Sequence, residues 1–176
     1  TLRSSGLAFS QPLILAVKHL VQIMTSIYDK EVISGQEIQD EVFRRMKKYE
    51  GKSFLECFSI YLGTAQLLEF ALKKILEEKF QVPSEETENC TLGQTRVKLE
   101  KYGVRADYTE LLKGVVKERN HAAHELLANH ALISSLGVEL SERMQFKELN
   151  HFIFGLERAV FLFDHIQHND AWLVSA

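Results

Sequence analysis

Cysteine and proline are scarce in this sequence, with two of each among 176 residues. Cys57 and Cys90 do not form a C-x-x-C pair, and two cysteines cannot build a disulfide framework. Cys57 lies among Phe54, Leu55 and Phe58, the setting of an ordinary core residue. These features indicate a reducing compartment and exclude the disulfide-rich secreted class of protein.

Long hydrophobic runs are also missing. The longest candidate, HFIFGLERAVFLFDHI at 151–166, contains Glu157, Arg158 and Asp164, so it falls short of the ~18 apolar residues of a membrane span. No signal-peptide pattern is present. We therefore expect a cytoplasmic protein without membrane partners.

Positive charge is not in excess. The net charge is -3, which argues against a protein that coats nucleic acid through a broad basic surface. Between Arg96 and Arg119, however, seven basic and four acidic residues leave a local charge of +3. The negative net charge therefore does not exclude a local anion-binding site in this segment.

Apolar residues recur at spacings of three and four, and strand-like alternation is lacking, which predicts an all-α fold in one domain, 1–176. We expect a helical bundle with a core at about 55–168 and an N-terminal helical extension at 1–52. The predicted helices cover 10–24, 36–48, 53–80, 92–102, 107–130 and 140–168, with a loop at 84–89.

The 107–130 helix holds the most informative segment, KERNHAAHELL at 117–127. At 100° per residue from Leu112, Arg119 falls at about -20°, inside the apolar stripe. The other members of that stripe are Val115, Val116, Ala122, Ala123, Leu126 and Ile133. A guanidinium keeps its charge, so at this position it needs an anionic partner or a cleft.

One edge of that stripe carries a polar ridge, which consists of Lys113, Lys117, Asn120 and His124. Arg119 is the inward neighbour of Asn120. An imidazole can transfer protons near neutral pH, and a guanidinium can bind a phosphate or a developing negative charge. We therefore predict Arg119, Asn120 and His124 as catalytic residues for phosphodiester cleavage without metal, and Lys113 and Lys117 as substrate-binding residues.

A purely structural interpretation competes with this one. An arginine beside an apolar stripe is often capped by a neighbouring carboxylate, and isolated histidines are more often structural than catalytic. The arginine-to-histidine spacing also recurs at Arg158 and His165, without the following asparagine.

The segment RNHAAH (119–124) resembles the R-N-x-x-x-H form of the Rx4-6H motif of HEPN (higher eukaryotes and prokaryotes nucleotide-binding) domains. The segment CTLGQTRVKLEKYG (90–103) is similar to the short helix that often precedes the motif, and GTAQLLEFALKKIL (63–76) is similar to an earlier long helix. The resemblance implies an all-α bundle that dimerises so that two motif helices face each other. Many such domains are metal-independent endoribonucleases, and others are inert dimerisation or RNA-binding modules.

Residue by residue, the resemblance implies that Arg119 stabilises the phosphate, Asn120 orients the substrate, and His124 acts as general base or acid. The RNA 2′-hydroxyl would be the nucleophile and would leave a 2′,3′-cyclic phosphate, so DNA should resist cleavage. No cofactor is implied. The family as a whole has roles in defence, toxin-antitoxin systems and stress, where an antitoxin or a nucleotidyltransferase can be the partner.

Some histidine spacings in the sequence resemble those of metal sites. Glu118-x-x-His121 and Glu148-x-x-His151 match the spacing of di-iron carboxylate bundles, but both pairs should point away from the apolar stripes of their helices. His121, at about 180° on the wheel, should face solvent or a second subunit, and His121 with His124 lacks a third zinc ligand. We therefore predict no metal site.

Apolar residues on two faces of the 140–168 helix favour a homodimer. An inert interaction module would also form such a dimer.

Overall fold

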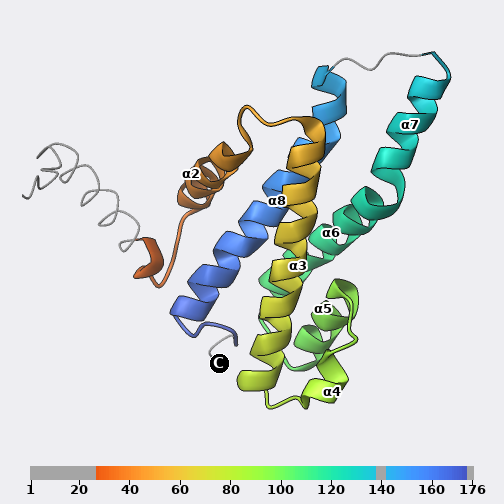
Figure 1. Ribbon diagram of the computed structural model, residues 1–176. Coiled ribbons are helices and arrows are strands. Elements are labelled where there is room, and N and C mark those ends of the chain that lie inside the picture. The colour runs from red at the N-terminus through yellow and green to blue at the C-terminus, as the bar shows by residue number, and fades with distance from the viewer. Residues whose placement is uncertain (1–26, 138–141, 174–176) are drawn as a thin grey trace, which may run out of the picture.

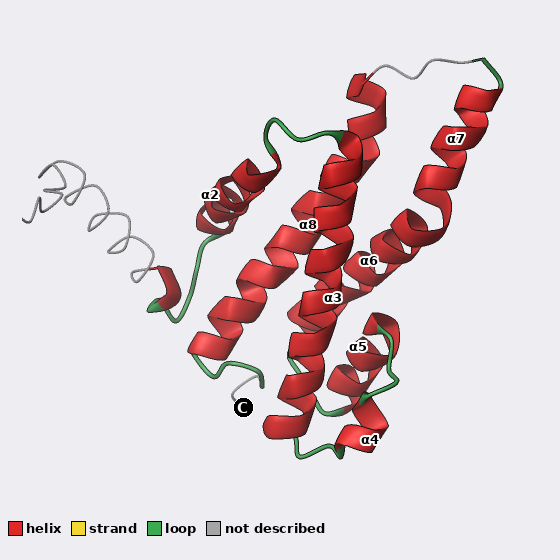
Figure 2. Ribbon diagram, in the orientation of Figure 1, coloured by secondary structure: helices red, strands yellow, loops and turns green. Residues whose placement is uncertain are grey.

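The computed structural model describes residues 27–137 and 142–173, and the predicted helix at 10–24 lies outside them. The all-α prediction is confirmed, because the described part of the chain contains helices and no strand (Figure 2). A single isolated bridge joins Val104 to Leu173. Within the described residues, no helix combines the length and apolar character that a transmembrane span requires.

The helices follow one another with short connections. They are α2 (Gly35–Met46), the 3-10 turn η1 (Lys47–Tyr49), α3 (Phe54–Glu78), α4 (Ser84–Thr87), α5 (Leu92–Lys101), α6 (Ala106–His121), the π-helical turn η2 (Ala122–Leu126), α7 (Leu127–Ser135) and α8 (Glu142–His168). These bounds agree within a few residues with the predicted helices at 36–48, 53–80, 92–102 and 140–168. Capping boxes at Ser34, Ser53 and Thr91 set the starts of α2, α3 and α5.

Two predicted boundaries are wrong. The expected loop at 84–89 contains the one-turn helix α4, which begins directly after Pro83 and has Glu85 and Glu86 in its first turn. Acidic residues near the N-terminus favour a helix, because they complement its macrodipole. The predicted helix at 107–130 is divided instead into α6, η2 and α7, so a single helical wheel does not describe it beyond His121.

The core is centred on α8, which packs against α2, α3 and α6 (Figure 1). Leu72 of α3, Leu112 of α6 and Leu156 of α8 are all fully buried. Cys57 is buried and unpaired, as its apolar neighbours predicted, and Cys90 is also a free thiol. Burial of these side chains supplies the main stabilisation of the bundle and holds α6 against α8.

The second apolar face of α8 is covered within the same chain. Phe161 is fully buried, its ring lies 5.9 Å from that of Tyr28, and the guanidinium of Arg45 lies 5.6 Å above it. Two turns earlier on α8, the Phe154 ring lies 5.7 Å from the Phe43 ring of α2. This face therefore gives no reason to expect a homodimer, because α2 and Tyr28 of the same chain cover it.

Candidate functional site

The motif predicted from the sequence lies at the C-terminal end of α6. Arg119 is partly buried, Asn120 is exposed, and Arg119 Nη1 donates a hydrogen bond of 3.2 Å to Asn120 Oδ1. His124 follows in η2 and is exposed. Its imidazole makes no hydrogen bond to any residue that the structure describes, so it is free to meet a substrate or a second subunit.

The predicted ridge is exposed along its whole length. Lys113, Lys117, Asn120 and His124 are all exposed side chains. The two lysines differ in their surroundings. Lys113 Nζ donates to Glu110 Oε1 at 2.8 Å, whereas Lys117 forms no ion pair with a described residue. Of the two predicted substrate-binding residues, Lys117 is therefore the one whose charge is available.

A π-helical turn interrupts the helix at the motif. Residues Ala122–Leu126 form η2, which begins directly after His121 and contains His124. Ala123, which the wheel placed in the apolar stripe, is exposed, while Ala122 and Leu126 are buried. The wheel was therefore wrong for Ala123 and right for Ala122 and Leu126. Turns of the π-helical kind are frequent at functional sites.

Tyr61 of α3 is a residue that the sequence reasoning did not single out as functional. Its side chain is fully buried, and its hydroxyl makes no hydrogen bond with any described residue. Burial raises the pKa of Tyr61; the negative charge of Glu118 raises it further, and the positive charge of Arg119 lowers it. A neutral, unpaired hydroxyl group thus lies within electrostatic range of Arg119. In the sequence, Tyr61 looked only like one more member of an apolar stripe.

Two histidine–carboxylate pairs cross the contact between α6 and α8. Glu118 Oε1 lies 3.3 Å from His151 Nε2, and His121 Nε2 lies 3.0 Å from Glu148 Oε1. Within its own helix, His121 Nδ1 lies 3.1 Å from Glu125 Oε2. The sequence placed both Glu-x-x-His pairs opposite the apolar stripes of their helices. In the structure Glu148 and His151 are exposed, and the partly buried Glu118 and His121 pair with them across the two helices. His121 also does not simply face solvent, since it joins α6 to α8.

These pairs fix the turn that carries Arg119. The Phe152 ring lies 5.7 Å from the His121 ring and 6.2 Å from the His151 ring, so it packs between the two pairs. Gly155 makes room for Glu118, because a Cβ at that position would lie 2.8 Å from Glu118 Oε2. Arg119 is thereby held between two residues that are both anchored on α8.

The cluster is built from histidine–carboxylate pairs, each of which is an ion pair when its histidine is protonated. In the part of the chain that the structure describes, no group of three or more His, Cys, Asp or Glu residues is arranged to hold a metal ion. Each histidine nitrogen in contact faces a carboxylate oxygen at hydrogen-bond distance. The arrangement therefore joins α6 to α8.

Burial raises the pKa of Glu118 above its ordinary value, although the charges of His151 and Lys117 oppose this. The folded protein then binds this proton more tightly than the unfolded chain, so stability is lost as pH rises through the folded-state pKa. We expect Glu118→Gln, which keeps an acceptor oxygen for His151, to unfold at a higher temperature than wild type at pH 7–8. The difference should vanish below about pH 4, where the carboxyl is protonated in both states.

Thermal unfolding at a series of pH values checks this expectation, with Glu125→Gln as the matched control. Glu125 is an exposed carboxylate on the neighbouring turn that also contacts a histidine. If Glu118→Gln is less stable than wild type at pH 7–8, the ionised Glu118 carboxylate does not destabilise the folded protein, and the expectation is wrong.

The second arginine–histidine pair of the sequence lies on α8. His165 is buried, and its Nε2 lies 2.7 Å from the backbone oxygen of Lys30, which can only accept a hydrogen bond. Arg158 is exposed and has no ion-pair partner among the described residues. His165 therefore has a structural contact that His124 lacks, so the two pairs are not equivalent.

Comparison with known proteins found no match for this chain, neither a protein-family model, nor a curated protein, nor a solved structure. The chemistry of the site therefore has to be inferred from its own residues.

Proposed function

We propose that this chain is a HEPN-like, RNA-acting domain that works in the cytoplasm as a metal-independent endoribonuclease. The observation that carries the proposal is the placement of Arg119, Asn120 and His124. A partly buried, permanently charged guanidinium is anchored beside an exposed amide, and an unengaged imidazole follows within a π-helical turn. This combination offers both phosphate binding and proton transfer.

In the proposed reaction, the RNA 2′-oxygen attacks the adjacent phosphorus and the bond from phosphorus to the 5′-oxygen breaks. His124 accepts the proton of the 2′-hydroxyl or donates a proton to the leaving 5′-oxygen, and the imidazole of a second copy performs the other step. Arg119 stabilises the negative charge that gathers on the phosphate oxygens. Lys117 binds a neighbouring phosphate of the RNA strand, and Lys113 adds to this once it leaves Glu110.

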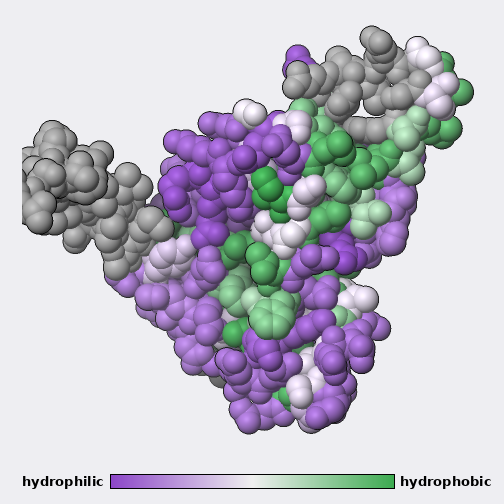
Figure 3. Space-filling view, viewed as in Figure 1, coloured by the Kyte–Doolittle hydropathy of each residue, from purple (hydrophilic) through white to green (hydrophobic). Residues whose placement is uncertain are grey.

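An apolar surface close to the motif supports a homodimer. Figure 3 shows hydrophobic side chains gathered over α3 and α7 on one face of the molecule. Exposed apolar residues on these helices include Leu67 and Phe70 of α3 and Leu127, Leu132 and Leu136 of α7. Leu127 is only three residues from His124. A second copy that covers this face would exclude water from apolar side chains and bring two motifs together.

The proposal is tested by incubating the full chain with a labelled single-stranded RNA in the presence of EDTA. We expect cleavage products with 2′,3′-cyclic phosphate ends, no cleavage of the matching DNA, and a dimer by light scattering. Arg119→Ala should abolish cleavage, whereas Arg96→Ala removes a partly exposed arginine that pairs with Glu100 and should retain it. Absence of cleavage by the wild-type dimer on a range of RNAs refutes the catalytic form of the proposal.

The second candidate is a non-catalytic homodimerisation or RNA-binding module of the same HEPN-like type. The exposed apolar residues of α3 and α7 favour this candidate. Two copies can associate through them without any residue that orients the His124 imidazole. An antitoxin or a nucleotidyltransferase would then be the partner whose activity the module controls. A dimer that binds RNA without cleaving it, and that keeps this binding in His124→Ala, would establish this candidate.

A further inference from the structure

A cavity of about 240 Å³ lies where residues 31–33, the start of α6 and the C-terminal half of α8 meet. Its lining includes Arg158 and His165, the second arginine–histidine pair of the sequence, which the proposed ribonuclease site does not use. The volume is below the ~300–1,000 Å³ of sites for drug-sized ligands. It therefore suits a small metabolite and is too small for a nucleotide.

The charges that line this cavity are balanced but incompletely paired. Arg105 donates two hydrogen bonds of 2.7 Å to the carboxylate of Asp107, so these two neutralise each other. Arg158 and Glu31 also line the cavity, and neither forms an ion pair with a described residue. Arg158 and Glu31 are thus the two charged lining residues without a partner among the described residues.

The remaining wall is apolar. It is formed by Ile33, Ile38, Leu111, Leu162 and Ile166, and Val32 stands at the rim with 82% of its surface exposed. Buried His165 contributes to the wall as a fixed group, because its Nε2 proton is engaged by the Lys30 carbonyl oxygen. A ligand with an apolar body would cover Val32 and remove its side chain from water.

We infer that this cavity binds a small zwitterion with an apolar body, of which an apolar α-amino acid is the simplest class. The carboxylate of the ligand pairs with Arg158, its ammonium group pairs with Glu31, and its side chain packs against the apolar wall. A phosphate ester is disfavoured, because the four charged residues of the lining, Arg105, Arg158, Glu31 and Asp107, sum to zero. This inference is independent of RNA cleavage.

The experiment measures binding of L-leucine, L-isoleucine, L-valine and L-phenylalanine to the full chain by calorimetry. We expect binding of at least one of them, and about tenfold or greater weakening in Arg158→Met and in Glu31→Gln, since each loses one charged hydrogen-bonding partner. Both residues are exposed and unpaired with described residues, so these variants should fold. For the amino acid that binds best, the analogues that lack its amine or its carboxylate should each bind about tenfold or more weakly.

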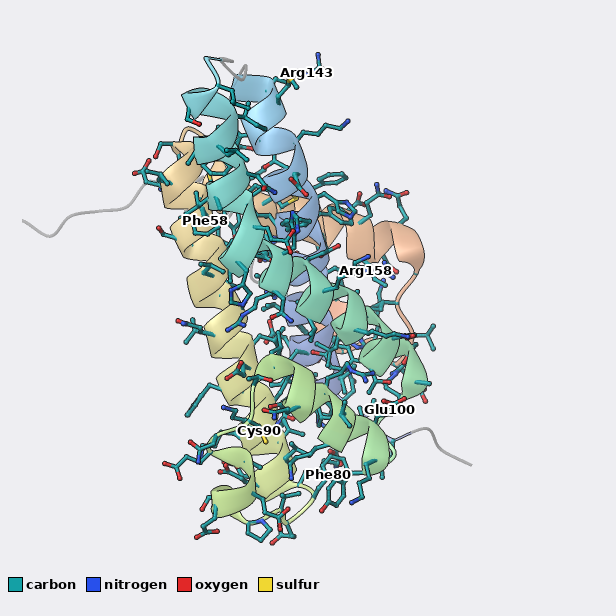
Figure 4. All side chains as sticks on the ribbon, turned by 90° about the vertical axis from the view of Figure 1, so that its right-hand side faces the viewer. Phe58, Phe80, Cys90, Glu100, Arg143 and Arg158 are labelled. Carbon is teal, nitrogen blue, oxygen red and sulfur yellow. The ribbon has the colours of Figure 1, made fainter. Side chains whose placement is uncertain are left out.

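Arg143→Met is the matched control, because Arg143 is also an exposed arginine on α8. It lies fifteen positions before Arg158, about 22 Å along the helix, and Figure 4 shows the two arginines well separated. This variant should bind the amino acid as wild type does. The inference is overturned by no binding up to about 10 mM, by equal binding of the deaminated acid, or by variants at Arg158 and Glu31 that bind like Arg143→Met.

Discussion

Replacing His124 with alanine is expected to lower the rate of RNA cleavage by about 10²–10⁴-fold, the usual contribution of a positioned general acid or base. The same change should alter the free energy of unfolding by less than about 0.5 kcal/mol, because the imidazole is exposed and bonds to no described residue. Single-turnover cleavage in EDTA, together with urea unfolding followed by circular dichroism, measures both quantities on one preparation.

His168→Ala is the matched control for His124→Ala. His168 is another exposed histidine, at the end of α8, where its Nε2 lies 3.1 Å from Asp29 Oδ1. This variant should cleave RNA at the wild-type rate. A His124→Ala protein that keeps the wild-type rate removes His124 from the mechanism. One that loses activity and unfolds in parallel assigns it to the structural network instead.

Replacing Trp172 with alanine is expected to destabilise the protein by about 3–5 kcal/mol, the typical cost of truncating a buried large aromatic side chain. Trp172 is fully buried, with its ring 6.0 Å from that of Tyr108 and 5.4 Å from that of Phe163. Its indole nitrogen donates to Gln167 Oε1 at 2.9 Å, and its backbone oxygen accepts from Arg105 N at 2.9 Å. The residue thus fastens the segment after α8 to the start of α6.

The measurement is urea unfolding followed by far-ultraviolet circular dichroism, because Trp172 is the only tryptophan and its loss removes the fluorescence signal. The adjacent variant Leu173→Ala is the control. Leu173 is 51% exposed, and its isolated bridge to Val104 is made by the backbone. Leu173→Ala should lower the free energy of unfolding by less than about 1 kcal/mol. Equal effects of the two variants contradict the assignment of Trp172 as the anchor.

The candidate site shows where sequence reasoning succeeded and where it stopped. Helical spacing placed Lys113, Lys117, Asn120 and His124 on one polar ridge beside the apolar stripe, and all four side chains are exposed in the structure. The relation of Glu118 and His121 to α8 does not follow from spacing, because it depends on how α6 and α8 cross. A wheel drawn for one helix contains no information about the partner helix, so it could not show that the two pairs meet each other.

The sequence by itself determined the all-α class and most helix bounds, because apolar periodicity and capping residues act within a few residues of one another. Only the tertiary structure decided that α2 covers the second face of α8, that a π-helical turn carries His124, and that Arg158 faces a cavity. Those outcomes depend on contacts between residues far apart in the chain. Such contacts form only when helices pack, and no local pattern specifies them.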